Sequence, residues 1–171
     1  TVEITAGDSP DEFTTSAHYT YAESGESVRS RGRAVVYTGY QWRGRSNRDD
    51  DDELREVMTV ERGWQEMNGR WFTGAYEEFG PDVKLMRTRG EIVLTGVYPR
   101  ALRIGAGATE VRVYGANLPT GASPTTFDFG PGVSVESVSN ASANVITLHT
   151  YVEENAMLGG RDLFVGGANL T

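Results

Sequence analysis

Short apolar runs, separated at regular intervals by Gly, Pro or Asn, fill the second half of the sequence. The separators include Tyr98-Pro99, Gly115-Ala116-Asn117-Leu118, Phe129-Gly130-Pro131-Gly132 and Gly159-Gly160. Each run between them has about four to eight residues, which suits a strand that ends in a turn and is too short for a typical helix. The spacing therefore predicts a small β-sandwich, which we place at residues 92–171.

The first half of the chain, residues 1–91, carries longer alternating segments. From Phe13 to Tyr21 the odd positions are mainly apolar and the even positions polar, which predicts a half-buried strand. Ser24-Gly25-Glu26 predicts a turn, and Ser27 to Arg45 predicts one long return strand. The glycines inside that strand permit the coiling or bulges that a curved sheet requires.

Further turn signals follow in this half. Leu54 to Val60 fits either a strand or a helical turn, and Arg62-Gly63 and Asn68-Gly69 predict turns, the second being a strong hairpin signal. Roughly six strands in about 90 residues indicate a closed, edge-protected architecture. The predicted fold is all-β: a small antiparallel β-barrel or sandwich at 1–91, followed by an immunoglobulin-like β-sandwich at 92–171.

Charge and cysteine usage exclude several functions. The net charge is −8, which opposes binding to nucleic-acid phosphates, so we expect no nucleic-acid partner. The chain has no Cys, which excludes disulfides, thiolate metal sites, Cys nucleophiles and covalently attached haem. No apolar run is long enough to cross a bilayer, so membrane insertion is not expected. The sequence starts at Thr1 rather than Met, which suggests a processed or excised piece.

The candidate metal and catalytic residues all have simpler explanations. Asp49-Asp50-Asp51-Asp52-Glu53 could hold a cation such as calcium, but a run of consecutive carboxylates is typical of a solvated loop. His18 and His149 lie on separate alternating strands, outside metal-ligand spacing, and His149 is expected to be partly buried. Gly105-Ala106-Gly107 precedes a predicted strand rather than a helix, which indicates a turn and not a dinucleotide site.

Serine chemistry has no support either, because no Ser stands in a G-x-S-x-G elbow. Tyr40, Trp42, Trp71 and Phe72 could line a barrel cavity for a small apolar ligand, although packing in a filled core is the simpler interpretation. We therefore predict no catalytic, cofactor-binding or metal-binding residue in this chain, and no cofactor.

Two sets of motifs carry a family resemblance. The second unit has Tyr98-Pro99 with Gly105, then Gly115-Ala116-Asn117-Leu118 and Phe129-Gly130, and so resembles an immunoglobulin-like module of the IPT/TIG kind. That module is informative about fold and not about function. The first unit has Tyr37-Thr38-Gly39-Tyr40-Gln41-Trp42-Arg43 and Gly69-Arg70-Trp71-Phe72. The combination resembles domains II and III of the quinohemoprotein amine dehydrogenase α subunit over nearly the whole chain.

The resemblance implies a periplasmic, Gram-negative setting and a scaffolding role. In that family these β-rich domains follow a dihaem cytochrome c domain, and the quinone cofactor lies on a different, small subunit. The expected function is thus non-catalytic support of the haem domain and of subunit contacts, with other domains or subunits of the complex as partners. The chain would not be an enzyme by itself.

Two other hypotheses stay open at this point. One is a free-standing extracellular binding module, which predicts a concave aromatic surface on loops. The other is a lipocalin-like small-molecule carrier, which predicts an open apolar cavity of about 300 Å³ or more inside the first unit. The scaffold hypothesis instead predicts one face with an exposed apolar patch of several hundred Å² where other domains dock.

Overall fold

The structure is a computed structural model that describes residues 1–49, 52–73 and 80–171. Contacts divide the chain into two compact units, each of which is described by itself. Unit 1 comprises Thr1–Thr20 and Glu26–Arg87, and unit 2 comprises Tyr21–Gly25 and Thr88–Thr171. The described residues contain strands and one 3-10 turn but no α-helix, so the all-β prediction is confirmed.

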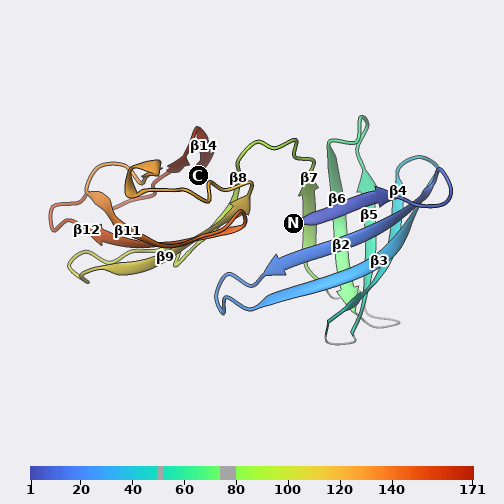
Figure 1. Ribbon diagram of the computed structural model, residues 1–171, viewed down its shortest axis with the longest axis horizontal. Coiled ribbons are helices and arrows are strands. Elements are labelled where there is room, and N and C mark those ends of the chain that lie inside the picture. Colours follow the sequence, from blue (N-terminus) through green and yellow to red (C-terminus); the bar gives the residue numbers. More distant parts are fainter. Residues whose placement is uncertain (50–51, 74–79) are drawn as a thin grey trace. The chain divides into compact units, whose positions relative to one another are not determined.

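Unit 1 is one antiparallel sheet in which each strand pairs with the next along the chain. The sheet curls into a half-barrel (Figure 1). The described residues of this unit contain seven strands, one more than the sequence indicated. They are β1 (Val2–Ala6), β2 (Glu12–Thr20), β3 (Ser27–Tyr37), β4 (Gln41–Arg48), β5 (Glu53–Val60), β6 (Glu66–Thr73) and β7 (Asp82–Met86).

The long return strand predicted from Ser27 to Arg45 is wrong, because the chain reverses in its middle. Thr38 and Gly39 both have positive φ, 54° and 79°, which is the backbone of a tight turn between antiparallel strands. Trp42 then lies opposite Val36 on the neighbouring strand. Gly39 therefore makes a hairpin and not the bulge that its position suggested.

The turn predicted at Asn68-Gly69 is also wrong, since both residues lie inside β6. The reversal instead falls at Gly63 and Trp64, with φ of 94° and 58°, so the Arg62-Gly63 turn is confirmed. Gly69 is needed for a different reason: a Cβ there would collide with the Val57 carbonyl oxygen on the neighbouring strand. A local turn signal was outweighed by the close approach of two strands.

Alternation places one face of the unit 1 sheet in a core. The buried apolar residues of that core are Ala17, Ala34, Val36, Trp42, Leu54, Met58, Val60, Met67 and Trp71. Phe13 packs against Trp42 with ring centroids 5.6 Å apart, and Tyr19 meets Trp71 edge-on at 6.1 Å. Gly32 and Gly44 face the same side, and a Cβ at Gly44 would lie 2.5 Å from Glu56 Oε2. Small residues on the inner face thus allow neighbouring strands and their side chains to approach closely in a strongly curled sheet.

Unit 2 has two sheets around one apolar core. The four-stranded sheet has the order β11-β12-β9-β8 and the three-stranded sheet the order β10-β13-β14. A 3-10 turn, η1 (Pro124–Thr126), precedes β10. The strands are β8 (Val93–Tyr98), β9 (Thr109–Ala116), β10 (Phe127–Asp128), β11 (Val133–Ala141), β12 (Val145–Val152), β13 (Leu163–Val165) and β14 (Ala168–Leu170).

Gly115, Asn117 and Leu118 of unit 2 each have a distinct structural role. A Cβ at Gly115 would collide with the Val93 carbonyl oxygen, and Asn117 takes a left-handed conformation at φ 56°. The Asn117 amide nitrogen also donates to the Glu91 carbonyl at 2.9 Å. Leu118 then enters the core, where it is 3% exposed. The G-x-N-L motif therefore combines close strand packing, a change of chain direction and an apolar anchor.

Candidate functional site

The aromatic residues singled out from the sequence separate into two groups. Trp42 and Trp71 lie in the core of unit 1, at 1% and 8% exposure. Tyr40 is 48% exposed at the β3–β4 turn, and Phe72 is half-buried next to Trp71 on the opposite face of the sheet. The four residues therefore do not line one cavity, and core packing accounts for the two tryptophans.

The other candidates stay apart as well. His18 lies on β2 and His149 on β12, each half-buried. Within the part of the chain that the structure describes, no three His, Asp or Glu residues are grouped so that they could hold a metal ion. Gly105 and Gly107 have positive φ and form a turn before β9. The acidic run 49–53 falls partly outside the described residues, because 50 and 51 are not among them.

A buried carboxyl group that the sequence analysis missed lies in the core of unit 1. Glu56 is 7% exposed, and its Oε2 accepts a hydrogen bond from Trp42 Nε1 at 2.8 Å. Its Oε1 lies 3.4 Å from the donating Ser46 hydroxyl. Burial raises the pKa of Glu56 above its ordinary value, and the two hydrogen bonds partly offset that rise. The signal was available, since Glu56 is in phase with Leu54 and Met58.

Thr15, Ser30 and Ser46 are also buried on this side of the sheet. The core around Glu56 is nevertheless filled: Trp42 and Met58 are 1% and 2% exposed. A carboxyl group that is surrounded by packed side chains and already bonded to Trp42 has no room for a substrate. We therefore regard Glu56 as a structural group and not as a general acid or base.

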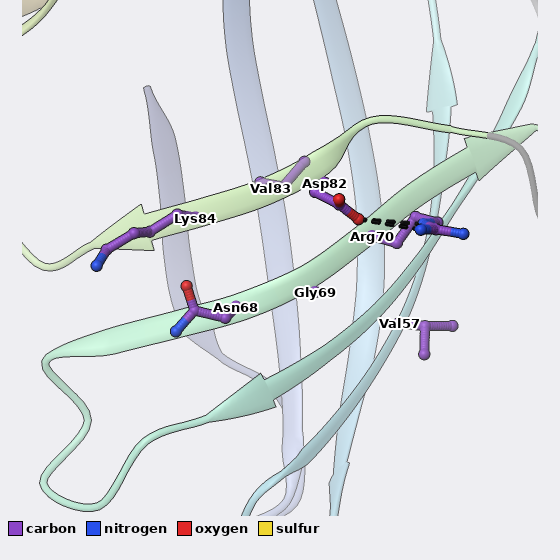
Figure 2. Close-up of a pocket in the computed structure, with 7 residues that line it drawn as sticks. All are labelled: Val57, Asn68, Gly69, Arg70, Asp82, Val83 and Lys84. Atoms are coloured by element: carbon purple, nitrogen blue, oxygen red, sulfur yellow. Dashed lines mark hydrogen bonds and ion pairs between the residues drawn. The ribbon is translucent and has the colours of Figure 1, made fainter.

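Two surface depressions lie on the opposite, outward face of the unit 1 sheet. The first, of about 560 Å³, is lined by residues of β5, β6 and β7 (Figure 2). Figure 2 shows Arg70 and Asp82 directed toward each other, and their charged groups are 3.1 Å apart. Lys84 pairs with Glu66 at 2.8 Å. The charges of this depression are thus largely neutralised by neighbours.

The second depression, of about 480 Å³, has a different character. Four arginines and one acidic residue are among the residues that line it: Arg33, Arg43, Arg45, Arg55, Glu56, Ala34, Val35, Tyr37, Gly44, Val57 and Phe72. The strand register places Arg33 opposite Arg45, and Arg45 opposite Arg55. We call the outward arginines of β3, β4 and β5 the arginine face, which consists of Arg29, Arg31, Arg33, Arg43, Arg45 and Arg55.

Few carboxylates accompany the arginine face. Glu53 pairs with Arg55 at 3.0 Å and lies 3.9 Å from Arg45. Arg43 donates to the Trp42 carbonyl at 2.9 Å, which holds its side chain along β4. Among the described residues, no ion pair is found for Arg29, Arg31, Arg33 or Arg43. The arginine face therefore carries an excess of positive charge, although the net charge of the chain is −8.

Unit 2 presents a contrasting surface, an apolar loop between β12 and β13. Met157 and Leu158 are 83% and 88% exposed. Arg161 fixes the loop from behind: one guanidinium nitrogen donates to the Pro131 carbonyl at 2.6 Å and the other to the Met157 carbonyl at 2.8 Å. The backbone that displays these two side chains is thus tied to the Phe129–Gly132 turn.

These features define a class of protein, an all-β accessory chain. Its described residues show filled cores, with no catalytic site evident. Residues 1–88 match the family described as quinohemoprotein amine dehydrogenase, alpha subunit domain II, and residues 91–171 match domain III of the same subunit. The chain therefore belongs to the quinohemoprotein amine dehydrogenase alpha subunit family and comprises its domains II and III, as the sequence motifs indicated.

A search of curated proteins gives no match to this chain. In the residues that the structure describes, no helix is long and apolar enough to cross a membrane.

Proposed function

We propose that the chain is a non-catalytic, structural part of a periplasmic quinohemoprotein amine dehydrogenase alpha subunit. Its two domains, 1–91 and 92–171, support the haem domain and the contacts with other subunits. The family match supports this role, since domains II and III are named as parts of an alpha subunit. The partners are other domains or subunits of the complex, without nucleic acid and without insertion into a membrane.

The IPT/TIG-like assignment of the second domain belongs to the same proposal. It is supported by the way the motif residues act: Asn117 turns the chain, and Leu118 and Phe129 enter the core at 3% and 8% exposure. Modules of this kind recur in receptors, enzymes and regulators alike, so the fold agrees with a supporting role without specifying it.

The apolar loop of unit 2, with Met157 and Leu158, supports the proposed contact role most directly. Exposed single apolar residues are common, but adjacent Met157 and Leu158 are both more than four-fifths exposed on a loop that Arg161 anchors. Burying one such side chain against a partner contributes about 1.5–3 kcal/mol. Because the backbone is already held in place, little conformational entropy is lost when a partner covers the loop.

The test is assembly of the complete alpha subunit with its partner subunits. The double variant Met157→Ser, Leu158→Ser should weaken the association at least tenfold, because two apolar contacts are lost. Met86→Ser is the matched control, since Met86 is 62% exposed on unit 1. Association that is unchanged in the double variant would count against the loop as a contact surface.

Location and setting are tested separately. Osmotic-shock fractionation of cells that express the complete gene should release the protein with the periplasmic fraction. The reading frame upstream of Thr1 should encode haem-attachment motifs. A cytoplasmic protein, or a frame without those motifs, would contradict the proposal and favour a free-standing module.

A further inference from the structure

The distribution of charge on unit 1 is uneven. The first 91 residues hold 12 Lys and Arg against 18 Asp and Glu, so this part of the sequence is acidic. Yet the outward positions of β3, β4 and β5 hold six arginines and one carboxylate, that of Glu53. On the flanking strand β2, Glu12 lies opposite Val35. At the end of the face, the Asp49 backbone N–H donates to the Arg29 carbonyl at 3.0 Å. The arginine face thus stands out from an acidic background.

The register makes this arrangement costly for the isolated chain. Arg33, Arg45 and Arg55 form one row across three neighbouring strands. Like charges directly opposite one another on antiparallel strands are destabilising. Glu53 offsets part of the repulsion through Arg55, but Arg33 has no ion-pair partner among the described residues. An anionic partner would relieve this repulsion.

The lining of the depression points to a protein as that partner. Val35, Val57, Tyr37 and Phe72 lie among the arginines, and Tyr37 is 53% exposed. Arg and aromatic residues are enriched at protein interfaces, where they supply much of the binding energy. The Arg guanidinium also binds carboxylates with two parallel hydrogen bonds. The net charge of −8 opposes binding to nucleic acid.

We propose that the arginine face docks an acidic protein surface, one that brings Asp or Glu carboxylates to Arg33 and Arg45 and an apolar side chain to the depression between them. The inference rests on the proposed function, because it names the chemistry of a partner subunit or domain of the amine dehydrogenase. It is separate from the apolar loop, since the arginine face lies wholly in unit 1.

The experiment measures binding of a probe to the 171-residue chain. The probe is a fluorescent peptide of four Glu, one Phe and four Glu, titrated at low and at physiological salt. The variant Arg33→Glu, Arg45→Glu should bind at least tenfold more weakly. The control Arg62→Glu, Arg87→Glu makes the same change in net charge at exposed positions elsewhere in unit 1 and should bind nearly as well as the wild type. Equal losses in both variants would overturn the proposal, because bulk charge would explain them.

Competition distinguishes a protein site from a general anion site. A heparin octasaccharide or vesicles of anionic phospholipid that bind through the same arginines more tightly than the peptide would overturn the proposal. So would dimers of the chain that dissociate on Arg33→Glu, Arg45→Glu, since the occupant would then be a second copy. Native tryptophan emission should show that the Arg33→Glu, Arg45→Glu variant is folded. If that variant does not fold, Arg33→Gln, Arg45→Gln is used in its place.

Assembly of the complete alpha subunit separates this inference from the proposed function. If Arg33→Glu, Arg45→Glu assembles normally while Met157→Ser, Leu158→Ser does not, the arginine face is not a docking surface and the proposed function stands. If neither variant affects assembly, the proposed function fails as well. Weakened assembly in the arginine variant, with normal assembly of Arg62→Glu, Arg87→Glu, supports both.

Discussion

Both units enclose a core of apolar side chains, but they differ in how their sheets enclose it and in which polar groups it contains. Unit 2 places two sheets around one core in which Val111, Val113, Ile146 and Leu148 are all fully buried, and the one buried polar residue among its described residues, Thr150, donates its hydroxyl to the Thr109 carbonyl at 3.1 Å. Unit 1 curls a single sheet, and its buried side includes Glu56 with its hydrogen bonds from Trp42 and Ser46. A rolled sheet brings its inner strands so close that small and polar residues share the space with large aromatics. Among the described residues, only the core of unit 1 thus encloses a carboxyl group, whereas the core of unit 2 is stabilised by apolar packing and one neutral hydroxyl.

The largest loss of stability is expected when a large apolar side chain is removed from the core of unit 2. Leu148→Ala removes a fully buried side chain of unit 2 and leaves a cavity, so we expect a loss of about 2–5 kcal/mol in the free energy of unfolding. Thr147→Ala, on the half-buried outer face of the same strand, should change it by less than about 0.5 kcal/mol.

All three Trp residues, Trp42, Trp64 and Trp71, lie in unit 1, so tryptophan emission reports on that unit only. Unit 2 is followed by hydrogen exchange of the β9 and β12 amides as urea increases. A loss below about 1 kcal/mol for Leu148→Ala would show that unit 2 can close the cavity, and that its core is less rigid than the contrast with unit 1 implies.

A smaller loss of stability is expected when the hydrogen bond between Trp42 and Glu56 in unit 1 is removed. Glu56→Ala leaves the buried Trp42 Nε1–H without an acceptor, which costs about 1–3 kcal/mol. The measurement is urea unfolding followed by tryptophan emission. Glu12→Ala, at an exposed position on β2, is the matched control and should be nearly neutral. Equal stability of the two variants would mean that Glu56 contributes nothing through Trp42, and the two cores would then not differ in kind.

The sequence predicted the strands of unit 1 better than their connections. Alternation locates β2, yet it predicts one strand from Ser27 to Arg45, because the alternating apolar positions resume in phase after the Thr38-Gly39 turn. Asn68-Gly69 resembles a hairpin turn locally, but Gly69 serves a close approach of β6 to β5. Such approaches depend on how strongly the sheet curls, which is not a local property of the sequence.

The surfaces were predictable only in part. Alternation already put Arg29, Arg31 and Arg33 on one polar face, but the row from Arg33 to Arg55 requires the register of three strands. Register follows from the turns, and one of those turns was missed. Met157 and Leu158 lie in a loop whose exposure depends on the hydrogen bonds of Arg161 to residues about 30 positions earlier. No periodic pattern in the sequence contains that information.

The smallest effect concerns the charge of Glu56. The Gln side chain of Glu56→Gln cannot ionise, but its amide oxygen can still accept the hydrogen bond from Trp42 Nε1. The change in the free energy of unfolding should therefore stay below about 1.5 kcal/mol, the scale of one neutral hydrogen bond. Burial raises the pKa of Glu56 above 4.5, so the folded state holds the proton more tightly than the unfolded state. The contribution of this proton to stability is complete below the ordinary pKa and is lost as pH rises through the raised pKa of the folded state.

The wild type should therefore lose stability relative to Glu56→Gln as pH increases from about 4.5, while the two are similar in more acid solution. Parallel urea titrations between about pH 4 and pH 8, followed by tryptophan emission, measure the difference. Glu12→Gln removes an exposed carboxylate and should show no such trend. A difference between wild type and Glu56→Gln that does not change with pH would show that Glu56 keeps its ordinary pKa in the folded chain. Glu56 would then behave as a solvated carboxylate, and the contrast with unit 2, in whose core no carboxyl group is buried, would be lost.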